Sequence, residues 1–192
     1  AINSVLSQTI ENFELIIVND GSTDNSVQIV KNFKDKRITL ISKENEGVSV
    51  ARNTGILKSS AKYIAFLDAD DEWLSDFLET IVNLINRYPH AKAFATATKR
   101  ENNQGDLLDV RFSTLPAHPW EGVIENLFKV MAYDSPPITS RSVCIQKKVL
   151  ISIGMFPIGV SRGEDLDTWI RVFLKYPIAF TTMSKALIHK DE

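Results

Sequence analysis

The chain has 192 residues, which is enough for one domain with a substantial buried core. Its 22 Lys and Arg residues nearly balance 24 Asp and Glu residues, and the formal net charge of −2 argues against nucleic-acid binding through bulk positive charge. The single cysteine, Cys144, excludes an intrachain disulfide, and its apolar neighbours predict a buried thiol. No apolar run approaches the length of a membrane span, so a cytosolic setting is expected.

In the first half of the chain, short apolar runs alternate with segments that have helical spacing of apolar residues. Helices are predicted at 1–10, 47–60 and 75–88, the last with Ser75 as its N-cap, and a turn followed by a helix is predicted within 21–33, with Ser22, Thr23 or Asp24 as N-cap. The predicted strands are 15–18, 37–42 and 63–67. Strands that alternate with helices predict a doubly wound α/β domain. Strands that are apolar throughout are typical of parallel sheets covered on both faces, so we expect a mostly parallel central sheet with helices on both faces.

The pattern becomes irregular beyond residue 98. Residues 101–109 are polar and turn-rich, and consecutive prolines at 136–137 require a loop. A helix is predicted within 123–133, a strand at 142–146, and a short helix, a loop and a longer helix within 148–177. There is no internal repeat and no linker composition, so the whole chain, 1–192, is predicted to form one domain with a regular first half and an irregular second half.

A cluster of carboxylates follows the third predicted strand, in the stretch "YIAFLDADDEWL". Asp68 and Asp70 point to the same side of an extended chain, and the strand ending at Asp20 delivers another carboxylate to the same edge of a parallel sheet. Mg²⁺ and Mn²⁺ prefer oxygen ligands and often complete their coordination with water and phosphate oxygens. The pair Asp68 and Asp70 is therefore predicted to anchor a divalent cation that neutralises a diphosphate.

Simpler roles compete with this prediction, because acidic residues between a strand and a helix also cap helices and complement the helix dipole. That role is favoured for Asp71 and Glu72, and for Asp20 considered alone the two roles are equally supported. Core packing is favoured for Trp73 and Trp169. Since a lone D-x-D sequence is a weak motif, the choice between metal binding and helix capping depends on other segments of the chain.

Several segments, in order along the chain, resemble family 2 glycosyltransferases, which have the GT-A fold and bind nucleoside-diphosphate sugars. They are "AINSVLSQTIENFELIIVNDGSTDNS", "NEGVSVARNTGI", "YIAFLDADDEW" and "GEDLDTWIR". Together they cover about residues 1–175, and their joint occurrence in order is far more specific than any one of them. The resemblance implies a donor-binding half at about 1–98 and an acceptor-binding, catalytic half at about 99–192.

The resemblance also implies roles in binding the donor. Asp20 would contact the nucleotide base, Arg52 would lie near the base or diphosphate, Asp68 would approach the ribose, and Asp70 would coordinate Mn²⁺ or Mg²⁺. These roles suit the residue types, because aspartate accepts hydrogen bonds from a base or from hydroxyls, and arginine offers a forked cation to phosphate oxygens. The favoured donor is a UDP-sugar.

For catalysis, the resemblance implies that Asp165 is the base of an inverting displacement, with Glu164 beside it near the acceptor. A helix start favours the ionised form of Asp165, although simple helix capping would explain both residues without the resemblance. The acceptor would be a carbohydrate or glycolipid in polysaccharide or surface-glycan synthesis, with peripheral membrane association. The irregular segment between Lys99 and Pro137 would help to form the acceptor side.

The sequence departs from the family pattern at its beginning, where the family has a strand ahead of the first helix. Because the chain starts inside a predicted helix at Ala1, we expect that this strand has been truncated. Two other functions stay open from the residues alone. One is a non-catalytic nucleotide-sugar binding module, and the other is a D-x-D phosphatase with Asp68 as nucleophile, which fits poorly because Asp71-Glu72-Trp73 follow the motif.

Overall fold

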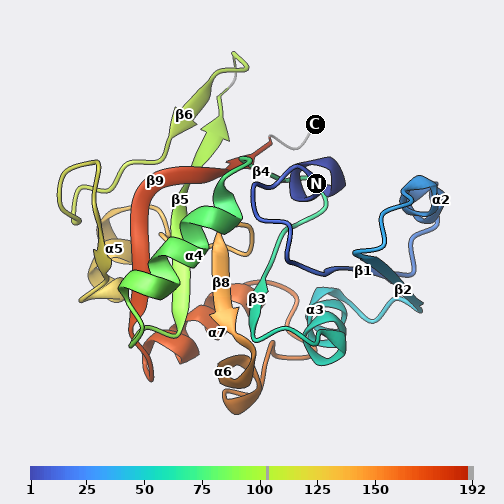
Figure 1. The fold of residues 1–192 in the computed structure, drawn as a ribbon. Coiled ribbons are helices and arrows are strands. Elements are labelled where there is room, and N and C mark those ends of the chain that lie inside the picture. Colours follow the sequence, from blue (N-terminus) through green and yellow to red (C-terminus); the bar gives the residue numbers. More distant parts are fainter. Residues whose placement is uncertain (103, 190–192) are drawn as a thin grey trace.

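The computed structural model describes residues 1–102 and 104–189, and within them the chain forms one two-stranded and one seven-stranded sheet with helices around them (Figure 1). The helices are α1 (Ile2–Leu6), α2 (Ser26–Asn32), α3 (Val48–Lys58), α4 (Phe77–Arg87), α5 (Leu127–Tyr133), α6 (Lys147–Ser152) and α7 (Glu164–Phe173). The strands are β1 (Leu15–Asp20), β2 (Ile38–Lys43), β3 (Tyr63–Ala65), β4 (Glu72–Trp73), β5 (Ala93–Glu101), β6 (Leu107–Asp109), β7 (Glu121–Val123), β8 (Val143–Gln146) and β9 (Ile178–Ile188). No helix of the described residues has the length and apolarity needed to cross a bilayer.

The large sheet has the strand order β3-β8-β5-β9-β4, with β6 paired to β5 and β7 paired to β9. Only β5 and β9 pair in parallel, and the other pairings in this sheet are antiparallel. The predicted α/β class is confirmed, but the expectation of a mostly parallel sheet is corrected. A strand that is buried on both faces is apolar throughout, whether it runs parallel or antiparallel to its neighbours. The sequence pattern therefore could not reveal that β8 lies between β3 and β5 and runs antiparallel to both.

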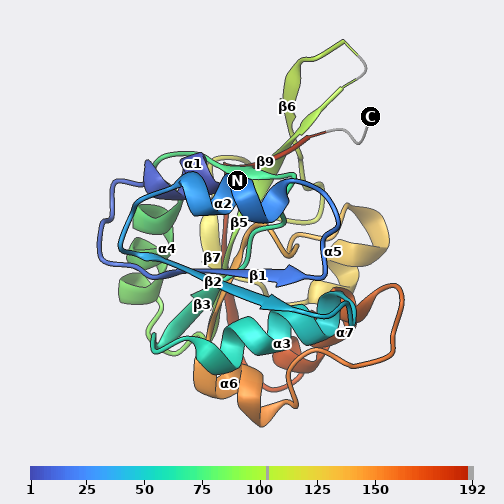
Figure 2. The same ribbon diagram turned by 90° about the vertical axis from the view of Figure 1, so that its right-hand side faces the viewer.

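β1 and β2 form a separate parallel pair joined through α2, and α3 packs against β1 (Figures 1 and 2). The turn after β1 requires glycine, since Gly21 has a φ of 77° and a Cβ there would lie 2.7 Å from the backbone nitrogen of Asn45. This turn brings the end of β1 against the loop that leads into α3. The β1–β2 sheet and α3 thereby become one structural unit.

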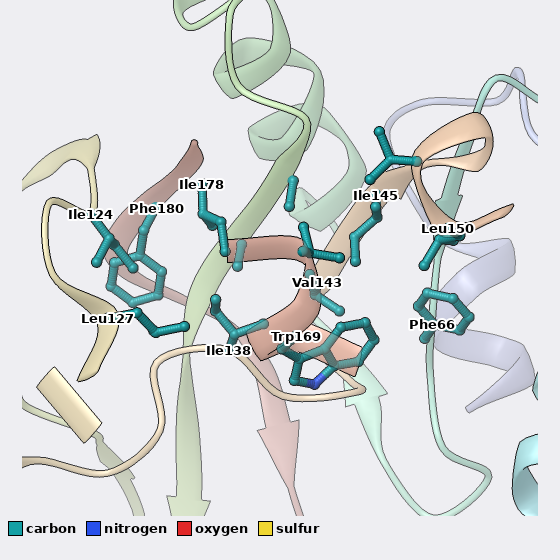
Figure 3. Packing of buried hydrophobic residues seen from close by; sticks show 14 of the residues in the cluster. Phe66, Ile124, Leu127, Ile138, Val143, Ile145, Leu150, Trp169, Ile178 and Phe180 are labelled. Carbon is teal, nitrogen blue, oxygen red and sulfur yellow. The ribbon is translucent and has the colours of Figure 1, made fainter. Parts of the chain in front are cut away.

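Helices cover both faces of the large sheet, as predicted. On one face, Phe77 and Ile81 of α4 pack against Phe94 and Cys144, so the predicted burial of the cysteine is confirmed. On the other face, Trp169 of α7 is the largest buried side chain, and it packs with residues of β5, β8 and β9 (Figure 3). The two groups of buried residues lie on different faces of the sheet because alternate residues of a strand point to opposite faces.

Both tryptophans singled out in the sequence pack in the core. Trp73 is 7% exposed and stacks on Phe77 with ring centroids 4.2 Å apart. Trp169 is 1% exposed and lies 5.8 Å from Phe66 and 5.4 Å from Phe156, measured between ring centroids. Phe66 directly follows β3 and leads into the acidic motif, so the Trp169 cluster supports the start of that loop.

The start of α4 differs from the prediction. Ser75 does not cap the helix, which begins at Phe77 after Asp76. The backbone of the two residues before Asp76 forms hydrogen bonds with other segments instead. The Leu74 amide donates to Lys185 of β9, and the Ser75 carbonyl accepts from Thr9. Similarly, α2 follows Asn25 rather than Ser22, Thr23 or Asp24. At α4 tertiary pairing decides where the helix begins, whereas at α2 the carboxylate of Asp24 accepts from the Ser26 amide at 3.0 Å although Asn25 is the N-cap.

The irregular segment between β6 and β7 is fastened at Asp134, which follows α5. One carboxylate oxygen accepts from the amide and hydroxyl of Ser113, and the other accepts from those of Thr114. Burial by itself would raise the pKa of Asp134, but these hydrogen bonds outweigh it and lower the pKa from an ordinary 3.8 to about 2. The ionised carboxylate therefore stabilises this loop.

We predict that Asp134→Ala lowers the free energy of unfolding by about 1–2 kcal/mol at pH 7, allowing for solvent screening. Because the folded pKa of Asp134 is depressed, its contribution is complete above about pH 4 and is lost as the pH falls towards about 2. Urea unfolding across this range measures the effect. Asp109→Ala, at an exposed position of β6, is the control. A deficit in Asp134→Ala that stayed constant down to pH 2 would contradict the prediction.

Candidate active site

The acidic loop, residues 66–71, leaves β3 at one end of the strand order and enters β4 at the other end. It crosses the start of β8, where the Phe66 amide donates to the Val143 carbonyl. Within the loop, the Asp71 amide donates to the Asp68 carbonyl at 3.2 Å and forms a turn. Its three aspartates thereby come to lie close to residues from β8 and from the helices on that face.

Two arginines supply positive charge to this loop. Arg52 of α3 places one guanidinium nitrogen 2.8 Å from Asp68 Oδ1 and another 2.8 Å from Glu164 Oε1. Arg141, two residues before β8, lies 3.5 Å from Asp68 Oδ2 through Nη2 and pairs with Asp71 through Nε. Carboxylates at this spacing repel one another, and the two guanidinium groups offset that repulsion.

Asp71 does not act as the helix cap that the sequence favoured. It is 2% exposed, lies six residues ahead of Phe77, the first residue of α4, and forms an ion pair with Arg141. Burial raises the pKa of Asp71 to about 6, and the attraction of Arg141 offsets this only in part, since Asp70 and Asp68 raise it further. The helix-cap prediction considered only neighbours in sequence, whereas the partner of Asp71 lies 70 positions away.

Asp70, by contrast, is exposed, and within the described part of the chain no other side chain pairs with it. Its oxygens are thus available to a ligand, while the neighbouring Asp68 and Asp71 are held by arginines. The described residues contain no group of three or more His, Cys, Asp or Glu side chains arranged to hold a metal ion.

Asp20 lies at the end of β1, where it holds the loop that enters α3. Its carboxylate accepts from Lys43 Nζ at 2.8 Å and from the backbone amides of Glu46 and Gly47 at 3.1 and 2.8 Å. Burial alone would raise the pKa of Asp20, but these hydrogen bonds outweigh it and lower the pKa. Lys43 closes β2 and was not singled out from the sequence.

α3 connects this nucleotide-side carboxylate to the acidic loop. Gly47, which donates to Asp20, precedes the helix, and Arg52, which pairs with Asp68, follows five residues later. Five residues of α-helix rise only about 7.5 Å. Asp20 and Asp68 are therefore not in direct contact, but a single rigid helix sets the distance between them.

Glu164 and Asp165 begin α7, and the structure gives them different partners. Glu164 pairs with Arg52, and its side chain is 12% exposed. Asp165 accepts a hydrogen bond at Oδ2 from the Ser140 hydroxyl, 3.2 Å away. Neither residue is the N-cap, a position held by Gly163 with a φ of 77° and no side-chain cap. The capping explanation is therefore wrong for Glu164, whereas Asp165 fulfils part of it, because its Oδ1 accepts from the Leu166 amide in the first turn of α7 at 2.6 Å.

The structure thus joins Arg52, Asp68 and Glu164 directly and places Asp70 and Asp165 beside that cluster. Ser140 and Arg141 were missed, and the sequence signal for them is weak, since "TSRSV" reads as a polar lead into a strand. His189, for which no role was predicted, lies 3.5 Å from Glu101 and 3.7 Å from Glu72.

A cavity of about 300 Å³ lies in the irregular half, near Thr182 of β9. It is lined by Asp109, Val110, Arg111, Phe112, Pro116, Ala117, His118 and Thr182. Most of these residues belong to the segment between Lys99 and Pro137 that the sequence assigned to the acceptor side. The cavity has both polar and apolar walls, which suits a ligand that combines hydroxyl groups with apolar faces.

The family model described as "Glycosyl transferase family 2" matches residues 1–146. Among curated proteins, an uncharacterized glycosyltransferase of Rickettsia bellii is 34% identical over 174 residues, and glycosyltransferase GlyA of Streptococcus pneumoniae is 45% identical over 172 residues. These matches cover 90% and 85% of the present chain, respectively, and 24% of each relative. The chain thus spans about a quarter of the length of these relatives.

Two further similarities bear on fold and substrate. An Escherichia coli protein named UDP-Glc:alpha-D-GlcNAc-diphosphoundecaprenol beta-1,3-glucosyltransferase WfgD is 42% identical over 86 residues, which are 44% of this chain and 34% of that protein. The crystal structure of Staphylococcus aureus TarS 1–349 in complex with UDP-GlcNAc superposes with a TM-score of 0.78 at 20% identity. It covers 100% of this chain and 54% of TarS 1–349, and at this identity the likeness establishes the fold.

We predict that a double-mutant cycle on Arg52→Met and Glu164→Gln gives a coupling free energy of about 1–3 kcal/mol, because both side chains are largely buried. Chemical denaturation of the four proteins measures it. The cycle on Arg87→Met and Glu121→Gln is the control and should give less than about 1 kcal/mol, since the Arg87 side chain is 67% exposed. Equal coupling in the two cycles would refute a specific role for the Arg52–Glu164 pair in holding α7 against α3.

Proposed function

Because the chain belongs to glycosyltransferase family 2, we propose that it transfers a sugar from a nucleoside-diphosphate sugar to an acceptor hydroxyl. The observation that carries the proposal is the state of the acidic loop. Asp68 and Asp71 are held by arginines, whereas the carboxylate of Asp70, between them, is exposed. The same cluster reaches Glu164, whose neighbour Asp165 begins a helix and carries a hydrogen bond from Ser140.

The donor is proposed to bind along the line from Asp20 through Arg52 to Asp68, in the half at about 1–98. A UDP-sugar is favoured, since TarS holds UDP-GlcNAc in a similar fold. Asp20 would accept from the base, Asp68 would accept from the ribose, and Arg52 would bind the diphosphate. Arg52 is already oriented by Asp68 and Glu164, so little side-chain entropy remains to be lost when the donor binds.

Asp70 is proposed to hold a divalent cation, Mn²⁺ or Mg²⁺, together with oxygens of the donor diphosphate. When bound, such a cation stabilises the negative charge that develops on the leaving nucleoside diphosphate. Asp68, next to it, is neutralised by Arg52 and Arg141, which keeps the loop folded in spite of its closely spaced carboxylates.

Asp165 is proposed to be the general base. It would take the proton of the acceptor hydroxyl while that oxygen forms a bond to the anomeric carbon and the bond from that carbon to the diphosphate oxygen breaks. Attack on the face opposite the leaving group inverts the configuration at the anomeric carbon. The Ser140 hydroxyl and the Leu166 amide, which both donate to the Asp165 carboxylate, would orient it for this step, and Glu164 would contribute to the acceptor side.

The acceptor is proposed to bind in the half at about 99–192, where the cavity near Thr182 lies. The name of WfgD describes a sugar acceptor on a lipid diphosphate, which supports a carbohydrate or glycolipid acceptor in polysaccharide or surface-glycan synthesis. Such an acceptor would bring the protein to the inner face of the membrane as a peripheral protein.

We predict that UDP binds more than tenfold more tightly with Mn²⁺ than without it, and that Asp70→Ala removes this difference. Calorimetric titration of UDP, with GDP as a comparison nucleotide, measures both effects. Asp109→Ala, which removes an exposed carboxylate from β6, is the matched control and should leave UDP binding unchanged. Binding that is independent of Mn²⁺ in both proteins would refute the metal role of Asp70.

We predict that Asp165→Asn lowers the turnover of UDP-glucose or UDP-GlcNAc by about 10²- to 10⁴-fold, the range typical of general bases. UDP affinity should stay within about twofold, because the proposed base does not bind the nucleotide. Release of UDP, followed with Mn²⁺ present, measures turnover. Asp167→Asn is the control on the same helical turn, where the carboxylate pairs with Arg171. Normal turnover in Asp165→Asn would require a different base, and a wild-type protein that binds UDP without any turnover would be a binding module.

A further inference from the structure

The two residues Ser140 and Arg141 lie in the turn that leads into β8, and both contact the proposed site. Ser140 is 2% exposed, and the Arg141 side chain is 24% exposed. The turn is closed by a hydrogen bond from the Ser142 amide to the Thr139 carbonyl at 3.0 Å and by the contact of their hydroxyls, also at 3.0 Å. β8, which follows, is buried along its whole length, so the turn is firmly anchored.

Arg141 fastens the acidic loop on both sides of Asp70. Its guanidinium contacts Asp68 on one side and Asp71 on the other, while its carbonyl accepts from the Trp73 indole at 2.7 Å. Three residues that flank Asp70 in sequence are thereby held by one arginine. The planar guanidinium fork makes such a contact directional, which a lysine ammonium on a flexible chain cannot reproduce.

Ser140 fastens the other carboxylate of the proposed reaction. Its hydroxyl donates to Asp165 Oδ2 at 3.2 Å, and within the described ranges no cation forms an ion pair with Asp165. The other oxygen, Oδ1, accepts from the backbone amide of Leu166 at 2.6 Å, so the Ser140 hydroxyl and this amide together orient the carboxylate. A carboxylate oriented in this way presents its remaining lone pairs in a defined direction.

We infer that Ser140 and Arg141 together are the positioning element of the active site, setting where the Asp70 loop lies relative to the Asp165 carboxylate. This inference rests on the proposed transferase function. The physical reason is the stiffness of the chain between the two residues. The hydrogen bond from the Ser142 amide to the Thr139 carbonyl and the buried strand β8 restrict the backbone dihedral angles of the turn, and the trans peptide keeps the two Cα atoms about 3.8 Å apart. The groups that the two side chains hold therefore keep a nearly constant separation.

Stability alone gives a weak reason for this arrangement. Taking Asp71 and Arg141 out of water is unfavourable, and a buried ion pair often contributes no more to stability than apolar residues of the same volume. The attraction of Arg141 also fails to compensate fully for the burial of Asp71. What the pair does provide is a loop of fixed shape, which a site that binds a cation and a diphosphate requires.

The first test replaces Arg141 by lysine, which keeps the charge and loses the fork. Calorimetric titration with UDP and Mn²⁺ should show affinity weakened by about 10- to 100-fold, as is typical when groups that hold a metal ligand are removed. If Arg141→Lys fails to fold, the double variant Arg141→Gln with Asp71→Asn removes both buried charges together and should show the same loss of affinity. Wild-type affinity in either folded variant would overturn the inference.

The second test separates positioning of the base from donor binding. Ser140→Ala should lower UDP release from UDP-glucose or UDP-GlcNAc by about tenfold, because it removes one of the two hydrogen bonds that orient the Asp165 carboxylate and leaves only the one from the Leu166 amide. UDP affinity should stay within about twofold. Ser142→Ala removes a hydroxyl that is equally buried in the same turn but has no contact with Asp165, and it should leave turnover unchanged.

The outcomes distinguish this inference from the function on which it rests. If the wild-type protein binds no UDP with Mn²⁺ and releases none from either donor, the proposed function is overturned and the inference falls with it. If the wild-type protein is active and Ser140→Ala behaves as Ser142→Ala does, positioning by Ser140 is overturned and the proposed function stands. A loss of turnover in Ser140→Ala that comes entirely from weaker UDP binding would overturn it as well.

Discussion

The arrangement of the site depends on the ion pairs that two arginines form with closely spaced carboxylates. Arg52 joins Asp68 to Glu164, and Arg141 joins Asp68 to Asp71. Without these cations the acidic loop would repel itself and the start of α7, because each partial burial of a carboxylate strengthens its electrostatic interactions. The two cations do not balance the negative charge, since Asp70 stays unpaired within the described residues. The excess negative charge that remains is consistent with the proposed binding of a divalent cation.

The same ion pairs hold the fold's halves together. Arg52 lies on α3, which packs against β1 and belongs to the nucleotide side, whereas Glu164 begins α7 in the irregular half. Arg141 precedes β8, which comes from the irregular half but pairs between β3 and β5. Glu164 and Arg141, from the second half, therefore contact Arg52 and the acidic loop, which belong to the first half. In the proposed function, donor binding and catalysis would be coupled through these few charged contacts, because both depend on where the contacts place the side chains.

Most of the local structure could be predicted because it follows from short-range patterns. Alternating apolar runs and helical stripes located α3, α4 and α7, and the segment "LIIVNDG" located the turn at Gly21. The residues that carry the proposed chemistry lie in continuous motifs, so Asp70 and Asp165 could be singled out as well. β9 is absent from the predicted elements, although it is the longest strand of the described chain. Its sequence mixes Thr, Ser and Lys with apolar residues, and burial between β5 and the edge strands decides its structure.

What the sequence by itself determined is the α/β class, the family motifs and the cluster of carboxylates after the third predicted strand. Tertiary structure alone decided the direction of β8, the burial of Asp71 and the choice of Arg141 as its partner. The physical reason is that ion pairing and strand direction depend on which segments meet in space. Asp71 and Arg141 are 70 positions apart, and neither has a local pattern that marks it. Composition can show that crowded carboxylates need a cation, but only the folded chain shows which cation reaches them.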